Sequence, residues 1–195
     1  MTASECPVVL LAAGGSRRFG TPKGLAELRG VPLIDRVMSV LSNQTVLTAI
    51  NCALDSPYAK HSQHIVPDVM TGGLGPLAGI HAAMVWAESR GYSEVITAPV
   101  DTPFLPDDYV ARLLVSGDTS VAVSDERLHP ICGLWSVATA DRLATAIEAG
   151  LRAAYEWADE VGAKTVAFEG DPDPFFNVNT PEDLVAAEQF LALRA

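Results

Sequence analysis

Residues 7–15 form a short apolar run that ends in two glycines: Pro7-Val8-Val9-Leu10-Leu11-Ala12-Ala13-Gly14-Gly15. A run of this length without polar alternation is typical of a strand buried on both faces, as the central strands of parallel sheets are. Similar runs predict further strands at 46–50, 94–98, 120–123 and 165–168. The first run therefore predicts a central parallel strand with a glycine-rich loop at its carboxyl end.

Apolar residues at helical spacing lie between the expected strands. They predict helices at 33–41, 77–87, 107–115, 139–148, 151–161 and 181–193. The last helix has the clearest start, because Thr180 can cap it, Pro181 suits its first turn, and Glu182 and Asp183 favour the positive end of its dipole. This alternation predicts an α/β fold, a three-layer α/β/α sandwich in which helices cover both faces of a mostly parallel sheet.

The composition is that of a folded globular protein. The 195 residues are 49% hydrophobic and 19% charged, which excludes the disordered class. We expect one domain over residues 1–195, because the length suits a single core and no linker or repeat interrupts it.

Charge, hydropathy and cysteine content limit the binding partners and the cellular location that we expect. A net charge of −11 argues against a nucleic-acid partner. No run approaches the roughly 18 apolar residues of a membrane span and no basic stretch precedes the first apolar run, so we expect a cytoplasmic protein without membrane contact. The three cysteines, at 6, 52 and 132, lack paired spacing. We expect reduced packing residues rather than disulfides or a zinc site.

The loop after the first expected strand is where an open parallel sheet binds its ligand. Residues 14–23 contain three glycines, which let backbone N–H groups approach an anion, and the cations Arg18 and Lys23. The loop matches neither the common P-loop nor the G-x-G-x-x-G spacing of dinucleotide sites. Taken alone, it fits a phosphate site and a plain glycine-rich turn about equally.

Other polar side chains follow the ends of expected strands. Asp101 stands between two prolines after the 94–98 run, where a rigid carboxylate suits Mg²⁺. Asn51 and Asp68 fall at the same edge and can bind a ribose, a base or a metal-bound water. Asn177 and Asn179 share one side of an extended segment and can hold a polar ligand. For each of them a turn or a cap is the alternative.

Two features are compatible with a structural role alone. Gly72–Gly79 joins a flexible loop to a helix start, where a ring can approach the backbone, although tight helix packing also explains Gly79. His129 is a lone histidine, more typical of a structural hydrogen bond than of catalysis. Hydrolysis has no support, because the chain lacks both a G-x-S-x-G elbow and an H-E-x-x-H motif.

The first loop and the residues after it resemble the signature of nucleotidyltransferases that join an NTP to a phosphorylated acceptor: Leu11-Ala12-Ala13-Gly14-x-Ser16-x-Arg18-Phe19-Gly20-x-x-Lys23, followed by Gly30-Val31-Pro32-Leu33-Ile34. Within that superfamily the chain is most similar to the MobA-type molybdenum cofactor guanylyltransferases. Four further blocks carry this likeness: Gly75-Pro76-Leu77-Ala78-Gly79, Val100-Asp101-Thr102-Pro103, His129-Pro130 and the block 177–184.

The resemblance implies a nucleotidyltransferase architecture of the nucleotide-diphospho-sugar transferase type. It implies transfer of GMP from GTP to the terminal phosphate of molybdopterin with release of pyrophosphate, assisted by Mg²⁺ on Asp101. Transient contact with cofactor-synthesis or molybdoenzyme proteins is also expected. By this likeness Arg18, Lys23 and Asp101 are catalytic, and Asn177 and Asn179 contact the acceptor. The implied GTP site comprises Leu11, Ala12, Ala13, Gly14, Lys23, Asn51, Asp68 and Asp101.

Two alternatives stay open. Ala13 replaces a glycine usual in the guanylyltransferases, and Leu-Ala-Ala-Gly looks more like the related molybdopterin cytidylyltransferases, which favours CTP. Phe19 replaces a usual methionine, and together with Ala13 it raises the alternative of a noncatalytic nucleotide-binding module in cofactor delivery. The blocks 75–79 and 177–179 resemble the guanylyl branch, and we weigh them above the single residue.

Overall fold

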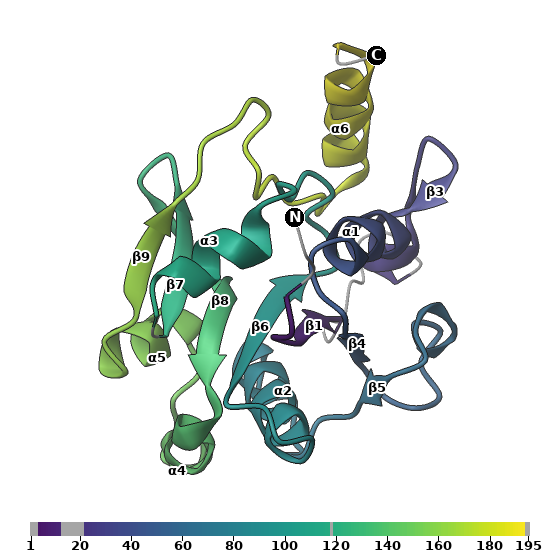
Figure 1. The fold of residues 1–195 in the computed structure, drawn as a ribbon. Helices are drawn as coiled ribbons and strands as arrows, with labels where there is room; N and C mark the ends of the chain where they lie inside the picture. The colour runs from purple at the N-terminus through teal and green to yellow at the C-terminus, as the bar shows by residue number, and fades with distance from the viewer. Residues whose placement is uncertain (1–3, 13–21, 118, 194–195) are drawn as a thin grey trace.

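The computed structural model describes residues 4–12, 22–117 and 119–193. Within them seven strands form one sheet in the order β5-β4-β1-β6-β8-β7-β9 (Figure 1). The parallel pairs are β1 with β4, β1 with β6, β4 with β5 and β7 with β9, whereas β8 runs antiparallel to β6 and β7. The expected, mostly parallel sheet with β1 in its interior is confirmed. The strands are β1 (Val8–Leu11), β4 (Thr48–Asn51), β5 (Ile65–Val66), β6 (Glu94–Pro99), β7 (Ser120–Ser124), β8 (Arg127–Ser136) and β9 (Lys164–Ala167).

Helices cover both faces of the sheet (Figure 1). Alternate residues of β1 point to opposite faces: Val8 and Leu10 enter one core cluster, and Val9 and Leu11 enter the other. The first cluster lies under α1 (Leu33–Ser42) and α3 (Tyr109–Val115). The second lies under α2 (Pro76–Glu88), α4 (Ala140–Glu148) and α5 (Ala154–Glu160). This is the predicted three-layer sandwich, with β1 buried on both sides as its uninterrupted apolar run requires.

The last helix belongs to a third, smaller cluster beside a hairpin. α6 (Pro181–Leu193) packs with β2 (Glu27–Leu28), which pairs with β3 (Val31–Pro32). The cluster contains Ala187 of α6, Leu28 of β2 and Val178 from the segment before α6. It begins as expected: Thr180 Oγ1 accepts a hydrogen bond from the Asp183 N–H (3.2 Å), and Asp183 Oδ2 accepts one from the Thr180 N–H (2.9 Å). This reciprocal cap holds the segment that leads into the helix in a defined place.

Several elements differ from the expectation, among them the short strand β5 and the start of α3 at Tyr109 instead of 107. The β2–β3 hairpin turns at Arg29 and Gly30, both with positive φ, and it was not predicted. α5 begins at Ala154 instead of 151, because Ala153 is extended. β8 was not predicted as a strand because it contains Pro130, which cannot donate to a ladder. The ladder accommodates the proline through a bulge: Val121 pairs with Gly133 and the next residue, Ala122, pairs with His129.

The three cysteines lie in the first core cluster or against it. Cys6, Cys52 and Cys132 are all free thiols. Burial raises the pKa of Cys6 to about 12 and raises the pKa of Cys132 as well, so these thiols are protonated at neutral pH and act as packing residues.

Over the part of the chain that the structure describes, every helix is too short or too polar to cross a membrane.

Candidate active site

The carboxyl ends of β1, β4 and β6 meet at one edge of the sheet. Leu11 ends β1 between Asn51 of β4 and Pro99 of β6, and the Ala12 N–H donates to the Asn51 carbonyl (3.1 Å). The chain leaves β1 towards α1 on one face and reaches β6 from α2 on the other. The switch point of the sheet, where ligands bind in such folds, therefore lies between β1 and β6.

Three of the predicted site residues converge beside this switch point. The ammonium group of Lys23, in the 3-10 turn η1 (Lys23–Leu25), donates to Asp101 Oδ2 and to Asn179 Oδ1. The side chains of Lys23 and Asp101 are only 16% and 14% exposed. The Val178 N–H donates to the Asp101 carbonyl (3.0 Å). The strand end that carries Asp101 and the segment that carries Asn179 are thus joined through both backbone and side chains.

A glycine and a tyrosine hold Lys23 in this position. Gly24 is buried, and its N–H donates to the Tyr58 hydroxyl (2.9 Å). A Cβ on Gly24 would lie 2.9 Å from Val100 Cγ2 and 3.0 Å from the Tyr58 ring. Only glycine fits there without a shift of its neighbours. Sequence reasoning missed Tyr58, because nothing in the pattern around it indicates a contact with the turn after Lys23.

Asn51 and Asp68 form a second group on the other side of β1. Asn51 is fully buried, and its amide donates to the Val66 carbonyl (2.9 Å) and to Asp68 Oδ1 (2.7 Å). Asn51 Oδ1 points at α2, since a Cβ on Gly79 would lie only 2.6 Å from it. Tight packing therefore accounts for Gly79. Among the described residues, no hydrogen bond links this group to Asp101.

The remaining predicted site residues are Ala13, Gly14 and Arg18, and they lie outside the described residues. Ala12, directly before this part of the chain, and Lys23, shortly after it, both lie at the carboxyl edge of the sheet.

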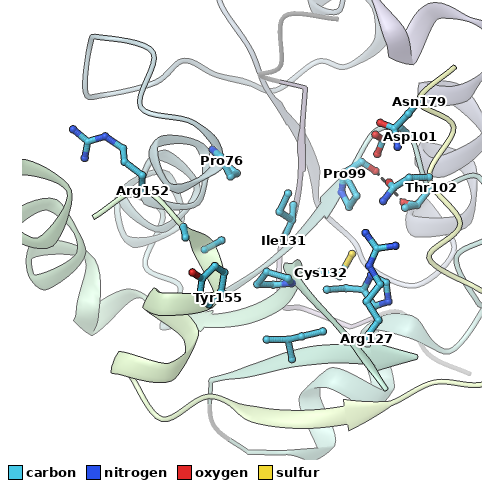
Figure 2. Close-up of a pocket in the computed structure, with 16 residues that line it drawn as sticks. Pro76, Pro99, Asp101, Thr102, Arg127, Ile131, Cys132, Arg152, Tyr155 and Asn179 are labelled. Carbon is cyan, nitrogen blue, oxygen red and sulfur yellow. Dashed lines mark hydrogen bonds between the residues drawn. The ribbon is translucent and has the colours of Figure 1, made fainter. Parts of the chain in front are cut away.

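A pocket of about 400 Å³ opens between β8, α5 and the carboxyl end of β6. Figure 2 shows Asp101 and Asn179 together at one end and Tyr155 towards the other. Asn177 also lines the pocket, whereas Val178 between the two asparagines is buried. Both amides predicted to share one side of this segment therefore border the same cavity.

Two arginines at this pocket were not predicted. Arg152 donates to the carbonyls of Ile147 (2.7 Å) and Leu151 (2.6 Å) at the end of α4, and its guanidinium points away from the cavity (Figure 2). It acts as a helix cap. Arg127 is exposed at the start of β8 and places a positive charge at the pocket. The sequence gives no signal of this role for Arg127, because exposed arginines beside turns are common.

The family is decided by a match over most of the chain: residues 8–161 match the model of the MobA-like NTP transferase domain. The chain belongs to this family. The likeness read from the first loop is confirmed, and with it the expected nucleotidyltransferase class.

Relatives of this MobA-like NTP transferase match it almost end to end. A molybdenum cofactor guanylyltransferase of Rhizobium leguminosarum bv. trifolii is 40% identical, over 98% of this chain and 96% of its own. One from Acidiphilium cryptum is 38% identical, over 96% of each chain. The crystal structure of molybdopterin-guanine dinucleotide biosynthesis protein A from Archaeoglobus fulgidus superposes with a TM-score of 0.76 at 26% identity, covering 96% of this chain and 99% of that one. The expected nucleotidyltransferase architecture is confirmed.

The donor set of this MobA-like NTP transferase fits a magnesium ion. Asp101 Oδ2 accepts from Lys23, but Asp101 Oδ1 is buried and has no hydrogen-bond partner among the described residues. A carboxylate oxygen in that state is costly unless a cation or a ligand binds it. Mg²⁺ commonly takes one or two protein carboxylates and completes its shell with phosphates and water. Among the residues that the structure describes, no cluster of three or more His, Cys, Asp or Glu side chains could hold a metal ion.

Proposed function

We propose that this protein transfers GMP from GTP to the terminal phosphate of molybdopterin, giving molybdopterin guanine dinucleotide and pyrophosphate, with residues 1–195 acting as one nucleotidyltransferase domain. The observation that carries the proposal is the contact of Lys23 with Asp101 and Asn179 at the switch point of the sheet, beside an open pocket. The full-length likeness to guanylyltransferases supports the choice of substrates.

The reaction joins two polyanions, so positioning and charge compensation are the main tasks of the protein. The terminal phosphate of molybdopterin attacks the α-phosphorus of GTP, and the bond to the β-phosphate oxygen breaks to release pyrophosphate. A phosphate monoester has a second pKa of about 6 and is largely dianionic at neutral pH, so the site needs no strong general base. Lys23, and Arg18 by the family likeness, offset the repulsion between the phosphates.

The two groups of residues divide the substrates between them. The backbone of Leu11 and Ala12 with the side chains of Asn51 and Asp68 serves GTP, and Asn177 and Asn179 serve the acceptor. Asp68 is exposed and held by the buried amide of Asn51, so its carboxylate is ready to accept hydrogen bonds from the nucleotide. The local cations Lys23 and Arg127 allow an acidic chain to bind phosphates, since only the field at the site matters for a small ligand.

Mg²⁺ is the proposed cofactor and Asp101 its proposed protein ligand. When bound, the ion neutralises charge on the nucleotide phosphates and on the leaving pyrophosphate. Lys23 keeps Asp101 Oδ2 occupied, which orients the carboxylate and leaves Oδ1 as the oxygen for the ion.

Gly79→Ala is expected to raise the KM for GTP at least about tenfold and to lower the free energy of unfolding by about 1–3 kcal/mol. The added methyl group would lie 2.6 Å from Asn51 Oδ1, so the amide that holds Asp68 has to move. Initial-rate kinetics and thermal denaturation measure the two effects. The double variant Asn51→Ala/Gly79→Ala is the control: its loss of stability is smaller than the sum of the single losses, because the clash is removed with the amide. Additive losses would contradict the packing argument.

The decisive experiment incubates the purified protein with molybdopterin, Mg²⁺ and either GTP or CTP, and identifies the dinucleotide product. We expect molybdopterin guanine dinucleotide and stoichiometric pyrophosphate. A cytosine dinucleotide as the main product would establish the CTP alternative suggested by Ala13. Tight GTP binding without pyrophosphate release would favour a noncatalytic module in cofactor delivery.

We further propose that this reaction takes place in the cytoplasm. The product would pass to cofactor-synthesis or molybdoenzyme proteins by transient contact.

A further inference from the structure

Three side chains from different segments form a hydrogen-bonded row that ends at His129, which lines the pocket. Ser124, the last residue of β7, donates from Oγ to Asp173 Oδ1 (2.7 Å), and His129 Nε2 of β8 lies 2.8 Å from the same Oγ. The Phe175 N–H also donates to Asp173 Oδ1 (3.0 Å). Ser124 and His129 are only 4% and 7% exposed, so the row is shielded from bulk water.

The direction of these bonds decides where the protons lie. An ionised Asp173 only accepts, so the single hydroxyl proton of Ser124 points to it. The hydrogen bond between Ser124 and His129 must then use a proton on Nε2, which leaves Nδ1 as the unprotonated nitrogen. The serine stands between the aspartate and the histidine, whereas a hydrolase triad places the histidine in the middle. Ser124 is therefore not an activated nucleophile.

Nδ1 is the ring nitrogen of His129 that no described residue binds. His129 lines the cavity, and its Nδ1 has no hydrogen bond to any residue that the structure describes. Because Ser124 holds Nε2, Nδ1 is the ring nitrogen that remains for a ligand in the cavity. The imidazole stacks on Phe175 with ring centres 4.5 Å apart, which fixes the plane of the ring. Burial lowers the pKa of His129 from its ordinary value of 6.5, so the ring is neutral at pH 7.

We propose, on the basis of the proposed function, that His129 Nδ1 accepts a hydrogen bond from an N–H group on the heterocycle of the acceptor, and that Ser124 and Asp173 are positioning residues that hold the imidazole in the required tautomer. A phosphate cannot be the partner, because both a neutral Nδ1 and an ionised phosphate oxygen only accept. In the proposed arrangement the nucleoside of GTP lies elsewhere, since Asn51 and Asp68 lie across β1, whereas His129 lines the pocket with Asn177 and Asn179. Asp101, which also lines the pocket, stands where the two substrates meet. His129 thus contributes to the recognition of the acceptor ring.

Two substitutions at His129 separate this role from a structural one. In His129→Asn the side-chain amide occupies the place of Nδ1. This variant keeps a hydrogen-bond acceptor for the pocket but loses the hydrogen bond to Ser124. In His129→Gln the longer side chain places its amide at the position of Nε2. This variant keeps the hydrogen bond to Ser124 but loses the hydrogen-bond acceptor at the position of Nδ1. We expect His129→Gln to raise the KM for molybdopterin about tenfold, the scale of one hydrogen bond, with the KM for GTP and the kcat at saturation unchanged. His129→Asn should raise the KM for molybdopterin less, about threefold.

Ser124→Ala adds a test that leaves His129 in place. Without the hydroxyl the tautomer is no longer fixed, and we expect a rise of about threefold in the KM for molybdopterin alone. Thermal denaturation checks that each variant folds. A larger effect of His129→Asn than of His129→Gln would assign the histidine a structural role and overturn the proposal, as would an equal rise in the KM for GTP. If the wild-type protein makes no dinucleotide, the proposed function fails first; an active wild type with unaltered variants refutes this inference alone.

Discussion

Asp101→Ala is expected to lower the kcat of GMP transfer at least about a hundredfold while the protein still folds. The carboxylate combines two functions: Oδ2 holds the Lys23 ammonium group and Oδ1 is left buried for the metal ion. Alanine removes both, but Lys23 keeps its hydrogen bond to Asn179. Pyrophosphate release at saturating GTP and molybdopterin measures kcat, and the Mg²⁺ concentration needed for half-maximal rate should rise as well.

Asp107→Ala is the matched control, because Asp107 is an exposed carboxylate in the turn before α3. We expect its kcat to stay within about twofold of the wild-type value. A folded Asp101→Ala protein with near-normal kcat would remove Asp101 from the mechanism. A loss in Asp107→Ala as large as that in Asp101→Ala would point to the overall charge of the protein instead of the site.

Lys23→Met is expected to reduce kcat/KM for GTP between about a hundredfold and a thousandfold. Methionine has nearly the length of lysine but no charge, so a half-buried Asp101 carboxylate then faces the triphosphate without its cation. The loss should also appear in stability, because removing one partner of a poorly exposed ion pair leaves the other unpaired; we expect about 1–3 kcal/mol. Initial rates at low GTP concentration and denaturant unfolding measure the two effects.

The control for Lys23→Met is Lys60→Met, which alters an exposed lysine in the 3-10 turn Ala59–His61. Its kcat/KM should remain close to that of the wild-type protein. The double variant Lys23→Met/Asp101→Ala should be little worse than the poorer single variant, since residues that act as one unit are not additive. Fully multiplicative losses would show that the two side chains act independently, contrary to their contact in the structure.

The strands and helices that the sequence predicted well carry a local signal of their own. β1, β6 and β7 are short apolar runs. The start of α6 is marked by neighbouring residues in the sequence, the capping Thr180 and the first-turn carboxylates Glu182 and Asp183. β8 lacks such a signal, because Pro130 is tolerated only where β7 shifts its register against it. The β2–β3 hairpin is likewise too short for a pattern and is stabilised by its packing against α6.

In the candidate site, too, some residues could be predicted from the sequence and others depend on contacts between distant segments. Asp101 and Asn51 follow from position, because a polar residue at the end of a buried parallel strand must lie at the ligand edge. The contact of Lys23 with Asn179 joins residues 156 positions apart and depends on how the segment before α6 folds back onto β6. The roles of Tyr58, Gly79 and Ser124 depend on single atom-to-atom contacts across the fold.

By itself the sequence determined the layered α/β fold and the polar residue types at the carboxyl edge of the sheet, because hydrophobic period and strand-end position are local properties of the chain. The tertiary structure decided which of those residues meet, which carboxylate oxygen of Asp101 lacks a hydrogen bond and which nitrogen of His129 is bound by Ser124. Hydrogen bonds require donor and acceptor within about 3 Å in a suitable direction. Geometry on that scale arises only when distant segments pack together.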